Sequence, residues 1–410
     1  MQASSSELHL DGEGQRWEPV VFNGTGTEYF KIWIVNLFLS ILTLGIYSAW
    51  AKVRSRRYFY GNTMLDGASF EYHATPIMIL KGRLIAVSFL LLAVFAGYIH
   101  PAAELFFLIL VALLAPWVIW RSLIFNAKMS SYRNVRFGFG SRVMPLYLYL
   151  LLVPLAPLLI AAIVLGIQYL SGTIEFPSSV ETESANSAAM ILTSTIAMAV
   201  GAIYLLVPFI QKSINSYYFN GHMFGQGKFR ARLQTYKYYM IYLKLLGIMV
   251  VGSLAIGVIV SFIVGFINMD LQSRLSSPGT EIATSAGTIF GFLMLIPLIA
   301  IATWLKAYMQ SRFRNYSLGQ LKLESVATFR SGIKVNKLFW LQFSNVLMLI
   351  CSIGLAYPWA VIRVTRYKLS TIDAQFFGDT DQFVTQMQSR QSALGEEIGE
   401  AFDLDLDLGI

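Results

Sequence analysis

The sequence predicts an all-α polytopic membrane protein, with six spanning helices, two related re-entrant or broken-helix elements and short cytoplasmic β-like segments. Three observations support this fold class. Apolar residues make up 56% of the 410 residues and charged residues only 13%, the mean hydropathy is +0.58, and long apolar runs recur along the chain. A soluble chain of this length would interleave charged residues far more often, so the composition indicates a multi-pass helical membrane protein.

Six apolar runs in the inner part of the chain approach the roughly 20 residues that a helical crossing needs. They cover residues 84–99, 105–120, 143–170, 189–210, 239–267 and 285–305. The segments 121–142, 211–240 and 306–337 between them are basic, whereas 171–187 is acidic and 268–284 is nearly neutral. Basic loops stay in the cytoplasm, so the six runs alternate across the membrane without conflict, and both termini are predicted to be cytoplasmic.

Two further apolar runs, at 30–50 and 338–360, do not fit a simple crossing. Residues 30–72 are related to 339–378, and within them 30–58 match 339–367 at a constant offset of 309. If both runs spanned, their matching arginine clusters would lie on opposite sides. Gly45 and its counterpart allow a helix to break, and 15 helical residues measure about 22 Å, short of the roughly 30 Å hydrocarbon core. Each run is predicted to enter the membrane and return; a plain helix that contains a glycine is the alternative.

The chain therefore divides into three parts. A polar tail at 1–29 has no signal-peptide pattern and ends in a short β-like piece, residues 30–378 form a single membrane domain with internal repeats, and 379–410 form an acidic tail.

The segment FNGTGTEYFKIWIVNLFLSILTLGIYSAWAKVRSRRYFYGNTMLDGASFEYH resembles the opening of the YjgN family, bacterial inner-membrane proteins built on a domain of unknown function. Its core, N-L-x-L-x-x-L-T-L-G-I-Y-x-x-W-A, is long and therefore specific. The RNVRFGFG stretch and the C-terminal copy extend the likeness to nearly the whole chain. The resemblance implies a location in the bacterial inner membrane, and it assigns no reaction and no catalytic residue.

Chemical motifs are missing from the sequence, which predicts that the protein is not an enzyme. The patterns of serine hydrolases, zinc proteases and nucleotide-binding loops do not occur. Cys351 is the single cysteine and the four histidines are scattered, so neither a metal nor a cofactor is expected. No carboxylate lies inside an apolar run, which counts against an ion-driven pump.

Neutral polar residues in the two end runs form the first candidate site, a transport pathway. Its residues are Asn36, Ser40, Thr43, Gly45, Asn345, Ser352 and Gly354. On a helix, Asn36, Ser40 and Thr43 fall within about 60° of one another, and the C-terminal run repeats the amide-to-hydroxyl spacing. An amide and a hydroxyl two turns apart could line a narrow path at the tip of a broken helix. Hydrogen bonding between helices, at roughly 0.6 kcal/mol per contact, is the alternative.

Basic and aromatic residues beside the membrane form the second candidate site, for anionic lipid headgroups. Its residues are Arg54, Arg57, Tyr58, Arg363, Arg366 and Tyr367. A basic residue near the surface contributes about 1 kcal/mol to headgroup binding. The alternative is that these charges only determine topology. Nucleic acid is not expected as a partner, because the positive charges are split among short loops beside the bilayer.

The sequence leaves three classes of function open. The first is a channel or transporter for a small solute or lipid, with its path between the two end runs. The second is a non-transporting scaffold that binds anionic lipid or a protein partner through a basic cytoplasmic face, and the third is a membrane-embedded enzyme. Anionic membrane lipids are expected partners in each, and a homo-oligomer or a further protein partner is left open.

Overall fold

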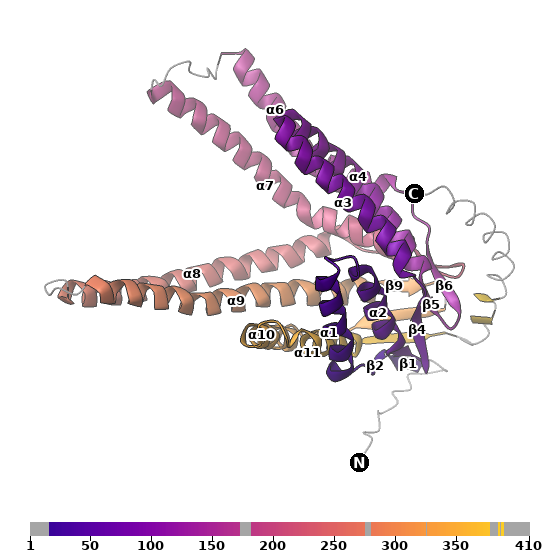
Figure 1. The fold of residues 1–410 in the computed structure, drawn as a ribbon. Helices are drawn as coiled ribbons and strands as arrows, with labels where there is room; N and C mark the ends of the chain where they lie inside the picture. Colours follow the sequence, from indigo (N-terminus) through magenta and orange to yellow (C-terminus); the bar gives the residue numbers. More distant parts are fainter. Residues whose placement is uncertain are drawn as a thin grey trace.

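The computed structural model describes residues 16–172, 182–274, 280–324, 326–377, 384–385 and 387–388. The acidic tail predicted at 379–410 and the first half of the polar tail therefore lie mostly outside the described residues. Figure 1 shows strands gathered at one end of the molecule, with pairs of helices projecting away from them.

In the described part of the chain, eleven short strands form one antiparallel sheet, which overturns the all-α prediction. They are β1 Arg16–Pro19, β2 Val21–Phe22, β3 Thr63–Leu65, β4 Ala68–Tyr72, β5 Ser130–Tyr132, β6 Val135–Phe139, β7 His222–Phe224, β8 Gly227–Ala231, β9 Leu321–Leu323, β10 Ala327–Ser331 and β11 Ile372–Phe376. The order is β1-β11-β10-β9-β8-β7-β6-β5-β4-β3-β2. Since β1 and β2 are consecutive in the chain yet lie at opposite ends of this order, the sheet is a nearly closed barrel.

The barrel interior is filled with apolar side chains. Every strand from β3 to β11 contributes at least one, including the fully buried Val135 and Ala374. The C-terminal segment adds Val384 and Met387 to the same cluster. The Nε2 of Gln388 beside them donates a hydrogen bond of 2.8 Å to a backbone carbonyl of the β5–β6 turn. Among the described residues, the barrel interior is therefore a packed apolar core.

Helical hairpins alternate with the β-hairpins along the chain. The helices are α1 Gly26–Leu42, α2 Ser48–Gly61, α3 Pro76–Ile99, α4 Pro101–Lys128, α5 Met144–Tyr147, the π-helical η1 Leu148–Leu152, α6 Val153–Leu170, α7 Thr182–Gly221, α8 Thr235–Arg274, α9 Thr280–Gly319, α10 Val335–Cys351 and α11 Tyr357–Leu369. Each hairpin leaves one strand and returns to the next, so its two ends lie on the sheet side.

Local sequence explains the turns and several helix starts. Asp66 and Gly67 between β3 and β4 both have positive φ, as do Arg133 and Asn134 between β5 and β6. Two such residues make the type I′ turn that suits the twist of antiparallel strands. Proline stands in the first turn of α3 and α4, where its fixed φ suits a helix and its missing N–H costs nothing.

Five helices in the described part of the chain are long and apolar enough to cross a membrane, so the prediction of six spans is wrong. They are Pro76–Ile99, Pro101–Lys128, Met144–Leu170, Ala188–Gly221 and Thr235–Leu254. The sixth predicted run, 285–305, belongs to α9, and residues 281–295 are not described at side-chain level. The remainder of α9 carries Lys306, Arg312 and Arg314, whose charges shorten its apolar run.

Candidate functional site

The two end runs form helical hairpins of the same design. We call α1–α2 the N-terminal hairpin and α10–α11 the C-terminal hairpin. Each first helix has 17 residues and stops just before the predicted glycine. Gly45 has a φ of +91° and Gly354 a φ of +84°. Both values lie in the region that glycine tolerates and other residues avoid, so glycine permits the break in each hairpin.

The predicted hydroxyl residues close these turns. The Oγ1 of Thr43 donates to the carbonyl of Leu39 at 2.7 Å and accepts from the backbone N–H of Tyr47 at 2.9 Å. The Oγ of Ser352 accepts from the N–H of Ala356 at 3.0 Å in the matching place. The carbonyl of Ser40 accepts from the N–H of Gly45 at 2.7 Å. Thr43 and Ser352 therefore satisfy backbone groups that the helix end leaves unpaired.

Asn345 holds the two helices of the C-terminal hairpin together. Its side chain is 5% exposed. The Nδ2 donates to the carbonyl of Ala360 at 3.0 Å, and the Oδ1 accepts from the Nη1 of Arg363 at 2.8 Å. Arg363 thus also contacts protein, although it is exposed. For Asn345 the structure shows interhelical hydrogen bonding.

Asn36, the counterpart of Asn345, is equally buried but has no such partner. Asn36 is 5% exposed, and neither its Oδ1 nor its Nδ2 is hydrogen-bonded. Asn36 follows Tyr29 by seven residues and so lies on the same face of α1. Tyr29 packs against Phe59 of α2 and Ile362 of α11. The free amide therefore lies on the face of α1 that meets α2 and α11.

Tyr58 and Tyr367 hold the chain that leads into each hairpin. The backbone N–H of Thr25 donates to the hydroxyl of Tyr58 at 2.8 Å, and that of Lys334 donates to Tyr367 at 3.0 Å. Tyr58 also donates to an Oε2 of Glu28 at 3.0 Å. Burial raises the pKa of Tyr58, and the nearby Glu28 carboxylate raises it further. This hydroxyl therefore stays protonated above its ordinary range.

Two of the predicted headgroup-binding arginines reach backbone carbonyls. The Nη2 of Arg57 donates to Ala74 at 3.2 Å, just before α3, and the Nη2 of Arg366 donates to Gly24 at 2.8 Å, just before α1. Arg57 thus joins α2 to the segment that leads into α3, and Arg366 joins α11 to the segment that leads into α1. Arg54, at the same register as Arg363, is exposed.

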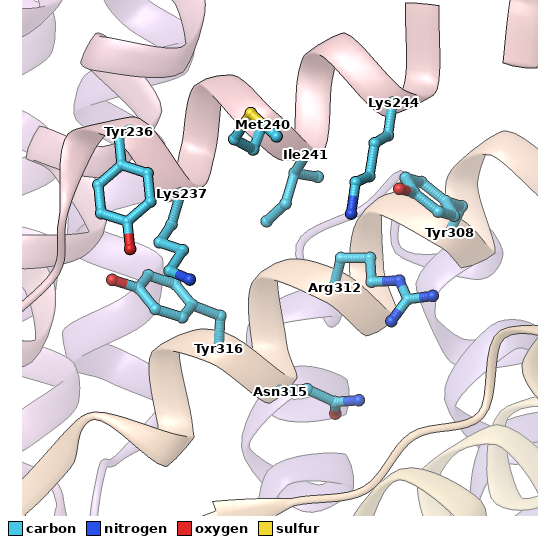
Figure 2. A pocket seen from close by; sticks show the side chains of 9 residues that line it. All are labelled: Tyr236, Lys237, Met240, Ile241, Lys244, Tyr308, Arg312, Asn315 and Tyr316. Carbon is cyan, nitrogen blue, oxygen red and sulfur yellow. The ribbon is translucent and has the colours of Figure 1, made fainter. Parts of the chain in front are cut away.

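Sequence reasoning missed a cavity of about 440 Å³ between α8 and α9, which is partly open to solvent and whose basic side chains are exposed. Its lining residues are Tyr236, Lys237, Met240, Ile241, Lys244, Tyr308, Arg312, Asn315 and Tyr316. Figure 2 shows Lys237 and Lys244 reaching from α8 toward the side chains of α9. The spacing of seven between these lysines was a visible signal, because it places them on one helix face. Among the described residues, no group of three potential metal ligands occurs.

Comparisons with known proteins agree with this architecture of apolar helices. The family model described as "Bacterial protein of unknown function (DUF898)" matches residues 17–401. The chain is 24% identical to "Inner membrane protein YjgN" of Salmonella typhimurium over 88% of this chain and 89% of the relative. It is 26% identical to the proteins of that name in Escherichia coli O157:H7 and K12, with the same coverage. No solved structure matches the chain.

The family match covers far more than half of the chain and includes both end hairpins and all of the barrel except the first residue of β1. The relatives are named as inner-membrane proteins, and five helices of this chain have the length and apolar character of membrane spans. The chain therefore belongs to the DUF898 family, as its resemblance to the YjgN proteins predicted, and its apolar helices fit a multi-pass membrane protein like these inner-membrane relatives.

Proposed function

We propose that this protein is a channel or transporter for a small solute or lipid, with its path beside the N-terminal hairpin. The observation that supports the proposal is the buried amide of Asn36, which has no hydrogen-bond partner. Leaving such a group unpaired costs about 1–3 kcal/mol, so native structures rarely keep one without a use. A passing polar group or a water molecule would satisfy it.

The packed barrel favours a lipid over a hydrophilic solute. Passage along the barrel axis would have to displace Phe224, Val135 and Met387 from the apolar core. A lipid can instead enter sideways between helices and leave the barrel intact. The tips of the two end hairpins carry Leu44 and Ile353, each 94% exposed, and such tips suit a lipid environment.

The proposal also orients the protein, with both termini in the cytoplasm. β1 pairs with β11, so the two ends of the described chain lie on the same side of the molecule. The basic segments 121–142, 211–240 and 306–337 return to this side, and basic loops are cytoplasmic. Ser5→Cys or Ser392→Cys, each in a Cys351→Ser background, should react with an impermeant maleimide only after spheroplasts are lysed. Labelling of intact spheroplasts would contradict the orientation.

Reconstitution tests transport directly. The full chain in liposomes should speed the exchange of a labelled phosphatidylglycerol between leaflets, while glycerol-driven swelling reports small-solute flux in parallel. Asn36→Leu should slow the exchange about tenfold, the effect of losing roughly 1.4 kcal/mol of hydrogen bonding along the path. Phe38→Leu, a change at an exposed position of the same helix, is the matched control and should not.

The outcomes separate this proposal from the scaffold alternative. Wild-type liposomes that move neither probe faster than empty liposomes would refute transport of both classes and leave the scaffold and the membrane-embedded enzyme. Faster exchange that Asn36→Leu does not alter would refute the path beside α1.

A further inference from the structure

The cavity between α8 and α9 lies where these helices meet the barrel. Its lining comes from the first ten residues of α8 and the last twelve of α9, which adjoin β8 and β9. Lys244 is nine residues into α8, about 14 Å along the helix axis. The same stretch of α8 belongs to the membrane span Thr235–Leu254. The cavity therefore lies at the boundary between the apolar span and the barrel.

Three positive side chains line this cavity without a negative one. Lys237 and Lys244 come from one face of α8, and Arg312 comes from the facing turn of α9. No carboxylate lines the cavity. Among the described residues, none of the three cations forms an ion pair with a carboxylate. Three like charges around one space repel one another, and an anion placed between them would remove that repulsion.

The rest of the lining suits an amphipathic ligand. The ammonium of Lys237 lies 5.0 Å from the ring of Tyr236, and the guanidinium of Arg312 lies 5.5 Å from the ring of Tyr308. Aromatic rings attract these cations but leave their N–H donors available to a ligand. Met240 and Ile241 supply an apolar wall beside the charges. The volume of about 440 Å³ falls within the range of small-ligand sites.

We propose that this cavity binds a phosphate-bearing anion, supplied in the membrane by the headgroup of an anionic phospholipid. The phosphate would lie among Lys237, Lys244 and Arg312, and the acyl chains would leave along the apolar side of α8. Basic pockets between spanning helices at a membrane boundary are suited to such headgroups. A free phosphate could bind the same three cations, but the apolar wall would add nothing to its affinity. The proposal is independent of transport, because a lipid can bind here without crossing the membrane.

Binding to the purified full chain in a neutral detergent tests the site. Phosphatidylglycerol, phosphatidylcholine and inorganic phosphate are titrated separately, by native mass spectrometry for the lipids and by calorimetry for all three. Phosphatidylglycerol should bind more tightly than phosphatidylcholine. The triple change Lys237→Gln, Lys244→Gln and Arg312→Gln should weaken that binding about 100-fold, roughly fivefold for each cation removed.

The matched control removes the same charge from a neighbouring surface. Lys228, Arg230 and Lys322 are exposed on β8 and β9, and their triple change to Gln should retain wild-type binding. Lys244→Arg keeps the charge and should also bind, which guards against a variant that merely misfolds. Both triple variants should elute as the wild type does in size-exclusion chromatography.

The outcomes decide both the site and the source of its ligand. Phosphatidylglycerol binding that the cavity triple removes and the control triple keeps supports the lipid site. Inorganic phosphate that binds as tightly, with the same dependence on the three cations, would assign the site to a free phosphate and overturn the lipid part. Equal binding by the two triple variants, or no preference of the wild type for phosphatidylglycerol over phosphatidylcholine, would overturn the proposal.

Discussion

The two end hairpins share a backbone design but differ in how they treat one buried amide. Both break after 17 helical residues at a glycine with positive φ, and a hydroxyl closes each turn. In the C-terminal hairpin Asn345 binds Ala360 and Arg363. In the N-terminal hairpin neither the Oδ1 nor the Nδ2 of Asn36 has a hydrogen-bond partner. The comparison teaches that the N-terminal hairpin forms without hydrogen bonds from its asparagine, so the buried amide of Asn36 does not serve to join the two helices.

The largest effect on stability is expected at Asn345. Asn345→Leu removes the two side-chain hydrogen bonds that join α10 to Ala360 and Arg363 of α11, although the exposed Arg363 keeps a contact of 3.3 Å with Ser344. A neutral hydrogen bond contributes about 0.5–1.5 kcal/mol and one to a charged group about 1.5–3 kcal/mol. The free energy of unfolding should fall by roughly that amount, which denaturant titration in detergent micelles can measure. An unchanged unfolding midpoint would show that Asn345 does not hold α10 to α11.

Replacing the glycine at either hairpin turn should lower the free energy of unfolding by the same amount. Gly45→Ala and Gly354→Ala place a side chain at φ +91° and +84°. No atom lies within 4 Å of the added Cβ in either case, so the penalty comes from backbone strain alone. That strain amounts to about 1–2 kcal/mol for a non-glycine residue in this region. A difference above 1 kcal/mol between the two variants, measured by the same titration, would mean that the turns are not equivalent.

The sequence predicted what depends on short segments and missed what depends on distant pairing. The break at Gly45 was predictable because the apolar run before it is too short to span and glycine permits a sharp turn. The barrel was not, because its strands have two to five residues and give no clear alternation of period two. The pairing of Trp17 with Gln375 joins the two ends of the described chain, which no local pattern reveals.

Sequence reasoning about the side chains of the candidate pathway was limited in the same way, because it did not know the fold. Thr43 and Ser352 were grouped with the asparagines by extending a helical projection, but α1 ends at Leu42 and α10 at Cys351. Beyond the helix end the projection no longer applies, and the hydroxyls serve the turn. Arg57 was predicted to bind headgroups from its charge. Its backbone acceptor lies on the next hairpin and could not be identified before the fold was known.

A smaller effect is expected from the tyrosines that fasten each hairpin, and it depends on pH. Tyr58→Phe removes the acceptor for Thr25 and the donor to Glu28, at a cost of about 1 kcal/mol near neutral pH. Because the pKa of Tyr58 is raised by burial and by Glu28, the unfolded chain loses its proton first. The stabilisation is therefore present below pH 10, the ordinary pKa, and declines as pH rises above it.

Unfolding titrations across this pH range check the tyrosine prediction. The wild type should lose stability more steeply above pH 10 than Tyr58→Phe does. Tyr367→Phe is the matched change in the C-terminal hairpin, and it should lower stability near neutral pH by a similar amount because Tyr367 accepts the corresponding bond from Lys334. Parallel pH profiles of wild type and Tyr58→Phe would contradict the raised pKa of Tyr58.

The smallest effect on stability is expected at Asn36. The sign of the change in the free energy of unfolding is the sharpest test of the difference between the two hairpins. Asn36→Leu has about the same side-chain shape, breaks no hydrogen bond, and removes an unpaired buried amide. The free energy of unfolding should stay unchanged or rise by less than about 1 kcal/mol, whereas Asn345→Leu lowers it. A loss comparable to that of Asn345→Leu would mean that Asn36 has a structural partner in the membrane. Unchanged stability would leave a polar group that the fold does not use, which is what a pathway requires.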